Sequence, residues 1–510
     1  MIRENDVNIE EGLLKSEADI DVLDEDPLAL PELQPASPSC SSTHKPYLHG
    51  LRGLAAFIVY TGHWIAWWYG PGGPIEHGFG YHGEMMFGTF PFIRTFFTGG
   101  SAAVHIFFVL SGYVLSVSSL RKIQSGHQVD MNRGLASAFI RRPFRLFIPL
   151  AGVSLTLALV MHLPFGLAPE LSWPQPLPTV WLELGKWFVE TTKMMNPLKL
   201  TGIGEPWFPY DPPAWTMSAE YKGSLAVFLA LGVCSVLPAT IYRAALFAAI
   251  GIVMLFVREW VVACFMAGMV LAVNDMEHLP SAFTCLSSKA RKITHNILFV
   301  TAWWTLCQPT DPDPKFAEST PGWYYVTKMT PSNYYTWENW RFWNTIGAIL
   351  LVYSISNLKW TQSFLSWRIM QFLGKISFSL YLAHMPFMWT IGDRICRVLG
   401  VQRGDFKTWW DNRLQIPDVG PKGLSTGFLL SQMIILPLNI LIALAAYKLL
   451  DQPGVNVGHW IVEKLRLGKR PRMRKIVKEN GAMVQYSALP SVSDLVRLSE
   501  LPSTYQSGYR

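Results

Sequence analysis

Long apolar segments recur along this chain and alternate with polar stretches that contain proline, glycine and charged residues. A transmembrane helix needs about 20 predominantly apolar residues, and segments near that length recur more often than a soluble domain requires. The pattern predicts an all-α, polytopic integral membrane protein with about ten transmembrane helices. The expected spans are 51–69, 99–118, 146–163, 222–240, 243–258, 259–274, 295–309, 341–357, 369–391 and 426–448.

The composition agrees with this pattern and divides the chain into three parts. Hydrophobic residues make up 50% of the chain and charged residues 15%, a balance typical of membrane proteins. Residues 1–46 are acidic and then rich in proline and serine, so we expect a disordered cytosolic tail there. Residues 47–450 form the expected transmembrane domain, and residues 451–510 form a basic, partly disordered cytosolic tail.

Basic residues predict the orientation in the membrane. They gather in three places, at Arg121, Lys122, Arg133, Arg141, Arg142 and Arg145, at Lys289, Arg291 and Lys292, and within 464–478. By the positive-inside rule these segments face the cytosol. Both termini are then cytosolic, and the endoplasmic reticulum and the plasma membrane remain alternatives for the organelle.

The excess of positive charge does not indicate a nucleic-acid partner. The net charge of +7 is explained by orientation and by attraction to membrane lipids, because no basic face is interleaved with stacking aromatic side chains in a soluble domain. The six cysteines show no paired CxxC spacing. No metal site is therefore predicted.

The first span carries two ionisable residues, Arg52 and His63, in the stretch LRGLAAFIVYTGHW. A helix turns about 100° per residue, so eleven steps return to nearly the same face, roughly 16 Å along the axis. An ionisable side chain at membrane depth costs a few kcal/mol or more and is a functional hypothesis by default. Two ionisable residues on one face of a helix favour the hypothesis that a ligand contacts both of them.

Two further spans carry histidines. His105 lies in SAAVHIFFVLSGYVLS, and His384 follows Ser377 and Tyr381 at helical spacing in KISFSLYLAHMP. Such a stripe is expected to face the protein interior. For each histidine, the simpler explanation is a hydrogen-bonding group between packed helices.

Glu220, Arg142 and Arg145 are the remaining candidates. Glu220 stands at the entrance of the fourth span, where it could complement the positive end of its helix. Arg142 and Arg145 lie in RRPFR and are three residues apart, so on a helix they would be neighbours that can bind a phosphate. A cytosolic anchor at the foot of the third span explains them equally well, and Pro143 disturbs the helical geometry at this point, because proline fits best in the first turn of a helix.

These residue types suggest a mechanism. Arginines could hold a phosphorylated donor while a histidine acts at its reactive end, because imidazole is the side chain with a pKa near neutrality that general-base catalysis requires. A carboxylate such as Glu220 could fix the tautomer of His63 and stabilise the imidazolium that forms. Intramembrane histidines and a carboxylate would also suit a proton-coupled transporter of a small solute.

Five motifs in order resemble the acyltransferase 3 family of integral-membrane O-acyltransferases, especially its fungal members. They are YLHGLRGLAAFIVYTGHW, HIFFVLSGYVLS, RRPFRLFIP, PAWTMSAE and GKISFSLYLAHMP, and the resemblance covers about residues 46–450. It implies about ten transmembrane helices and the transfer of an acyl group, often acetyl, from acyl-CoA to a hydroxyl of a sugar, lipid or secondary metabolite. Acyl-CoA is then a substrate, and no permanently bound cofactor is expected.

The resemblance also assigns roles to the candidate residues. It implies that His63 is the catalytic base with Glu220 as its acidic partner, and that Arg52, Arg142 and Arg145 handle the acyl-CoA phosphates. Lining of the cavity is implied for His105, Ser377, Tyr381 and His384. We expect selectivity for the acceptor to lie in the two long aromatic loops, 164–221 and 310–340, which the topology places on the exoplasmic side.

Overall fold

The computed structural model describes most of the chain as two compact units. The described residues are 45–70, 77–170, 174–198, 207–277, 279, 285–310, 314–335, 338–401, 408–467, 476–477 and 483–484. Unit 1 is drawn from Met1–Leu110, Ala282–Tyr381 and Asp418–Phe428, and unit 2 from the rest of the chain. The predicted acidic tail lies outside the described residues, apart from its last two positions.

The fold is helical, with one antiparallel pair of two-residue strands in the described part of the chain. Helices within unit 1 are α2 (Pro46–Tyr69), α3 (Thr95–Thr98), α10 (Ser288–Thr305), α11 (Pro314–Glu318), α12 (Tyr324–Lys328), α13 (Ser332–Tyr335), α14 (Asn339–Asn357) and α15 (Lys359–Leu365). Unit 2 contains α5 (Gln128–Val160), α6 (Val180–Met194), α7 (Trp215–Cys234), α8 (Thr240–Phe256), α9 (Trp260–Glu277), α17 (Asp393–Val398), α19 (Gln452–Lys464) and the strands β1 (Ile476–Val477) and β2 (Met483–Val484). Residues of both units belong to α4 (Gly100–Gln124), α16 (Arg368–Phe387) and α18 (Thr426–Ala446).

Four helical segments among the described residues are long and apolar enough to cross a membrane. They are Gly100–Gln124, Gln128–Val160, Trp260–Glu277 and Thr426–Lys464. The other six expected spans also fall on helices, namely α2, α7, α8, α10, α14 and α16. An all-helical protein with several apolar helices is therefore confirmed, and the number of ten spans stays a prediction.

Helix α5 differs most from the expected element. It begins at Gln128, well before the predicted start of the third span, and it contains both Pro143 and Pro149. A proline inside a helix removes one backbone hydrogen bond, but a helix in a packed membrane bundle tolerates this loss. The RRPFR cluster therefore lies in the middle of a continuous helix, and Pro143 does not prevent Arg142 and Arg145 from being neighbours on it.

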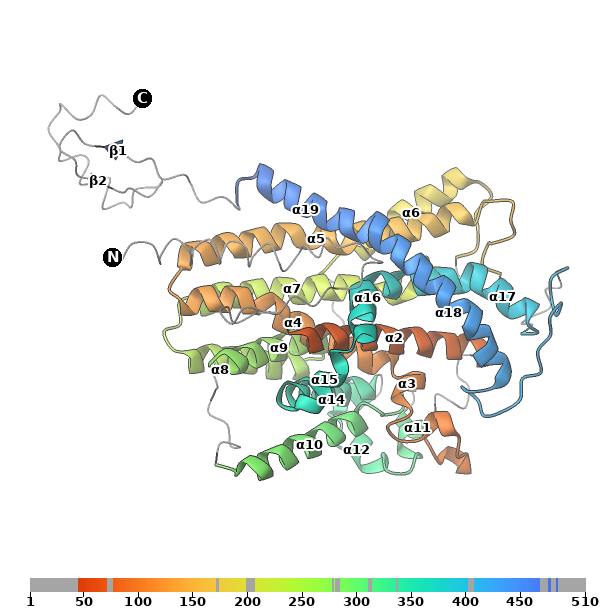
Figure 1. Ribbon diagram of the computed structural model, residues 1–510, viewed down its shortest axis with the longest axis horizontal. Coiled ribbons are helices and arrows are strands. Elements are labelled where there is room, and N and C mark those ends of the chain that lie inside the picture. The colour runs from red at the N-terminus through yellow and green to blue at the C-terminus, as the bar shows by residue number, and fades with distance from the viewer. Residues whose placement is uncertain are drawn as a thin grey trace. The chain divides into compact units, whose positions relative to one another are not determined.

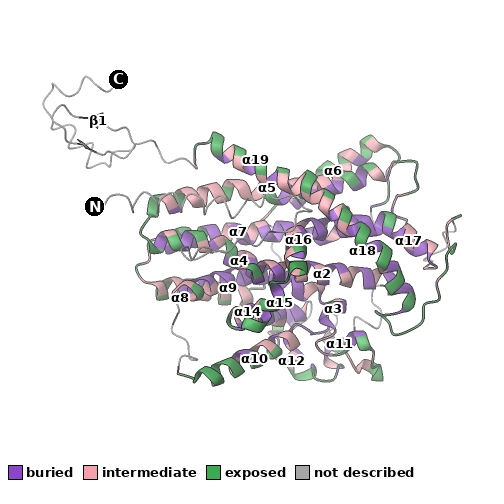
Figure 2. Ribbon diagram, viewed as in Figure 1, coloured by how far each residue is buried: buried purple, intermediate pink, exposed green. Residues whose placement is uncertain are grey.

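In unit 2, α5 lies alongside α6, α7 and α19 (Figure 1). Helix α9 packs against both α7 and α8 and is buried along most of its length, whereas α8 is largely exposed (Figure 2). Gly112 of α4 faces the backbone of Phe265 on α9, and a Cβ at position 112 would overlap the Phe265 carbonyl group. The glycine therefore permits this close approach of two helices.

We expect Gly112→Ala to destabilise the protein by about 1–3 kcal/mol, because the added methyl group forces α4 and α9 apart in a packed interior. Thermal unfolding in detergent measures the loss. Gly100→Ala on the same helix is the matched control, because a Cβ at position 100 meets nothing within 4 Å. Equal midpoints for the wild type and the Gly112 variant would contradict the packing described here.

In unit 1, α2 makes an equally close contact with α16. A Cβ at Gly53 would overlap the backbone of Gly374, and a Cβ at Gly374 would overlap His49. Helix α2 also packs against α3 and α15, and α10 packs against α14. The loop before α14 is held by a parallel stack of Trp304 on Trp323, with ring centroids 4.4 Å apart. These contacts give α2, α14 and α16 fixed neighbours.

Candidate functional site

Arg52 and His63 lie on one unbroken helix, as predicted. Helix α2 begins with Pro46 at its first position and continues to Tyr69, which suits proline because the first turn has no intrahelical donor to lose. His63 forms a hydrogen bond with the backbone of Val59, one turn earlier. In a neutral imidazole one nitrogen donates and the other accepts, so the bond to Val59 leaves an acceptor nitrogen that can serve as a base.

Arg52 and Ser377 meet at one backbone carbonyl. The Nη2 group of Arg52 donates to the oxygen of Gly374 at 3.1 Å, and the Ser377 hydroxyl donates to the same oxygen at 2.8 Å. The close approach of α2 and α16 at Gly53 makes this possible. The structure thus brings together two residues that the sequence placed on different spans.

Helix α16 carries the polar stripe that the spacing predicts. Ser377, Tyr381 and His384 are all buried, with His384 fully inaccessible to solvent. The ring of Tyr381 packs edge to face against Phe107 of α4. The expectation that this stripe faces the protein interior is therefore confirmed, whereas its role in lining a substrate cavity stays a prediction.

His105 is fully buried at the beginning of α4. Its Nδ1 donates to the carbonyl oxygen of Ser101 at 2.7 Å, and the ring also forms a hydrogen bond with the backbone of Arg341. The guanidinium of Arg341 on α14 is close enough to interact with His105 electrostatically. Arg341 in turn forms an ion pair with Glu338 at 2.9 Å. A buried polar cluster thus surrounds His105.

Arg142 and Glu220 form an ion pair within unit 2. Arg142 also donates from Nε to the Ser224 hydroxyl at 2.8 Å, and Glu220 is hydrogen-bonded to Ser111. Arg145 lies one turn from Arg142 on α5, is exposed and interacts electrostatically with the same pair. The predicted contact of Glu220 with His63 would join residues of different units, and it stays a prediction.

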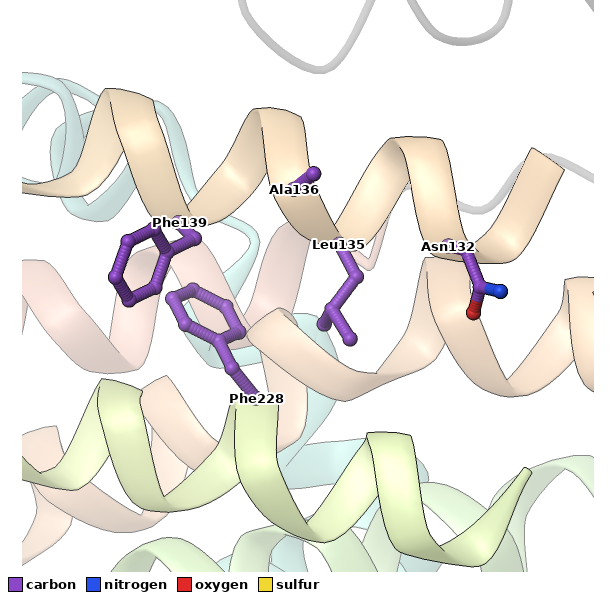
Figure 3. A pocket seen from close by; sticks show the side chains of 5 residues that line it. All are labelled: Asn132, Leu135, Ala136, Phe139 and Phe228. Atoms are coloured by element: carbon purple, nitrogen blue, oxygen red, sulfur yellow. The ribbon is translucent and has the colours of Figure 1, made fainter. Parts of the chain in front are cut away.

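A depression of about 350 Å³ lies between α5 and α7 (Figure 3). It is lined by Asn132, Leu135, Ala136 and Phe139 of α5 and by Phe228 of α7. Phe139 precedes Arg142 by three residues and Phe228 follows Ser224 by four, so each lies one helical turn from the Arg142 interaction. The two phenyl rings pack edge to face, with centroids 6.3 Å apart. An apolar surface thus adjoins a pair of arginines.

The loop between α5 and α7 holds buried charged residues that the sequence did not single out. Glu183 of α6 is fully buried and accepts hydrogen bonds from the Tyr210 hydroxyl and from the Leu177 backbone at 2.7 Å. Asp211 is also fully buried, and neither of its carboxylate oxygens has a hydrogen-bond partner among the described residues. Burial raises the pKa of Asp211 well above its ordinary value. The stretch PYDPPAW shows an acidic residue among aromatic residues and prolines, which is the signal that could have indicated this position.

We expect Asp211→Asn to stabilise the protein at neutral pH. Because the folded-state pKa is raised, the wild type gains stability from the protonated acid below the ordinary aspartate pKa near 4, and it loses that contribution as pH rises through the raised pKa. Asparagine cannot lose a proton, so the unfolding midpoint of the variant should fall less between pH 5 and pH 8. Thermal unfolding across this range measures the difference, and parallel curves for both proteins would contradict it.

Asp411→Asn is the control, because we expect it to change stability at neutral pH in the opposite direction. Burial acts to raise the pKa of Asp411, but hydrogen bonds from Arg397 and Thr408 outweigh it and hold the pKa below its ordinary value. The Arg397 contacts measure 2.8 and 2.9 Å. This carboxylate contributes stability above the ordinary aspartate pKa and loses it as pH falls, so its replacement should lower the midpoint at neutral pH.

Comparison with known proteins gives two matches. A family model described as an acyltransferase domain matches residues 45–448. The O-acetyltransferase PaAT-1 of Phomopsis amygdali is 26% identical over 443 residues, which are 82% of this chain and 84% of that protein. No solved structure matches the chain.

Proposed function

We propose that this chain, which belongs to the acyltransferase 3 family, transfers an acetyl group from acetyl-CoA to a hydroxyl of a sugar, lipid or secondary metabolite, with His63 as general base. Family membership makes the chain a membrane O-acyltransferase. The name of the related O-acetyltransferase supports acetyl as the group transferred. The observation that carries the assignment of the base is the position of Arg52 and His63 on the single helix α2.

The proposed reaction needs two proton transfers, to His63 and from His63, and the exchange of one carbon–sulfur bond for one carbon–oxygen bond. The acceptor oxygen attacks the thioester carbonyl carbon and its proton moves to the acceptor nitrogen of His63. The carbon–sulfur bond of the donor then breaks, and the CoA sulfur leaves with the proton that His63 returns. The bond from His63 to the Val59 backbone supports the neutral tautomer that this step requires.

The arginines are proposed to hold the phosphates of acetyl-CoA. Arg142 and Arg145 are neighbours on α5, and a guanidinium binds phosphate oxygens through two parallel hydrogen bonds. Glu220 positions Arg142 through the ion pair, and its predicted contact with His63 remains part of the proposal. Arg52 is proposed to contact the donor as well, from the end of α2 opposite His63.

We also propose the arrangement in the membrane. The helices that coincide with the expected spans are consistent with ten crossings, and the basic segments favour cytosolic termini. With this arrangement RRPFR faces the cytosol, where acyl-CoA is available. The two long aromatic loops, 164–221 and 310–340, where we expect selectivity for the acceptor, then lie on the opposite, exoplasmic side of the membrane.

The experiment that tests the proposed activity is a thiol-release assay with purified protein in detergent. Acetyl-CoA is supplied with glucose, ergosterol, farnesol or tyrosol, and the acetylated product is identified by mass spectrometry. We expect thiol release above the rate without acceptor for at least one compound, with one ester formed per thiol. A folded protein that releases no thiol with any of them would contradict the proposal.

A further inference from the structure

Asn344 of α14 is a buried amide with an unpaired polar atom. Its side chain is inaccessible to solvent, its Nδ2 group donates to the Ser101 hydroxyl at 3.3 Å, and its Oδ1 atom has no hydrogen-bond partner among the described residues. An unpaired buried polar atom costs about 1–3 kcal/mol. If the amide is rotated by 180°, the unpaired atom becomes Nδ2 instead, so one unmet polar group remains in either orientation.

Ser101, the partner of Asn344, and His63 both belong to unit 1. Gly62, which precedes His63, lies next to the end of α3 and the beginning of α4, where a Cβ at position 62 would lie 3.4 Å from the carbonyl oxygen of Phe97 and 4.0 Å from the backbone nitrogen of Gly100. Ser101 follows Gly100 and is the partner of Asn344. The side chains of His63 and Ser101 thus start from residues next to a direct contact between α2 and α4.

Other polar side chains lie close to Asn344. Ser101 connects it to His105, whose Nδ1 group donates to the Ser101 carbonyl oxygen. Arg341 lies three residues before Asn344, on the same face of α14, and interacts electrostatically with His105. Side chains of α4 and α14 therefore form one polar cluster, which begins at Ser101, the residue after the one that approaches Gly62 of α2.

We propose that Asn344 binds the hydroxyl of the acceptor and positions it for attack. A hydroxyl both donates and accepts hydrogen bonds, so it satisfies the unpaired atom of Asn344 in either orientation of the amide. The proposal rests on the proposed acetyl transfer and assigns the acceptor side of that site.

The test compares Asn344→Leu with the wild type, using the acceptor that shows the highest kcat/KM among glucose, ergosterol, farnesol and tyrosol. We expect the KM for that acceptor to rise about tenfold or more, because a buried hydroxyl would lose its partner. The KM for acetyl-CoA should change less than twofold. Asn357→Leu is the matched control on the same helix, because Asn357 is exposed and bonds within α14 to the Tyr353 carbonyl.

Asn344→Ser serves as the second variant if the leucine variant does not fold. Its hydroxyl is too short to reach both Ser101 and an acceptor, so the acceptor KM should rise in this variant as well. An unchanged acceptor KM in a folded variant, or an equal rise for acceptor and acetyl-CoA, would overturn the role of Asn344 while leaving acetyl transfer intact. If an ordered water, and not the acceptor, is the partner of Asn344, the acceptor KM should be unchanged in a folded variant. Absence of transfer by the wild type would instead overturn the proposed function and, with it, this inference.

Discussion

Replacing His63 with glutamine should lower the rate of acetyl transfer by about 10²–10⁴-fold, the contribution typical of a positioned general base. Glutamine keeps a polar side chain of similar size but has no group that takes a proton near neutral pH. The bond between His63 and the Val59 backbone holds the imidazole in one tautomer, so the lost function is chemical. Acetyl-CoA consumption at saturating acceptor measures the effect.

The control for this prediction is His127→Gln, which changes an exposed histidine outside the helices. Its activity should match that of the wild type. Binding of acetyl-CoA to the His63 variant, measured by calorimetry, should be retained, because the base acts on the acceptor. A His63 variant with the wild-type rate would exclude it as the base and leave the family assignment intact.

Arg142→Ala should destabilise the protein by about 3–5 kcal/mol and raise the KM for acetyl-CoA. Removal of one partner of a buried ion pair leaves the other charge without compensation, and Glu220 is 8% exposed. The substitution also removes the hydrogen bond that Arg142 donates to the Ser224 hydroxyl. Thermal unfolding in detergent measures the first effect, and initial rates across acetyl-CoA concentrations measure the second.

Two further variants separate stability from donor binding. Arg142→Met combined with Glu220→Leu replaces the ion pair by apolar side chains and should recover stability, but the KM for acetyl-CoA should stay high. Arg145→Ala removes an exposed side chain, so it should raise that KM about tenfold with little change in stability. Wild-type stability and KM in Arg142→Ala would contradict the role given to this residue.

The relative positions of residues within one helix could be predicted from the sequence. Helical periodicity is a local property, so the common track of Arg52 and His63 and the buried stripe of α16 followed from spacing alone. The neighbouring positions of Arg142 and Arg145 also required nothing more than a continuous helix at that point. The structure confirms these three features.

Other features depend on contacts between distant segments and could not be predicted. Arg142 and Glu220 are 78 residues apart, and no periodic pattern links them. The apolar pattern indicated the span that begins near residue 146, but it did not reveal that α5 begins at Gln128 and continues through Pro143 and Pro149, because tertiary packing carries the helix through both prolines. Helix α6 was not predicted within the loop 164–221, although Thr179 caps it by accepting a hydrogen bond from the Leu182 backbone.

The most direct test of the central claim is to follow a labelled acetyl group. Wild-type protein in proteoliposomes is given acetyl-CoA with a ¹³C-labelled carbonyl and the best acceptor from the thiol-release assay, and all products are analysed by mass spectrometry. The account predicts an acceptor ester that carries the label, one for each CoA thiol released. Accumulation of unlabelled acceptor inside the vesicles, with acetyl-CoA intact, would contradict it and indicate a transporter instead.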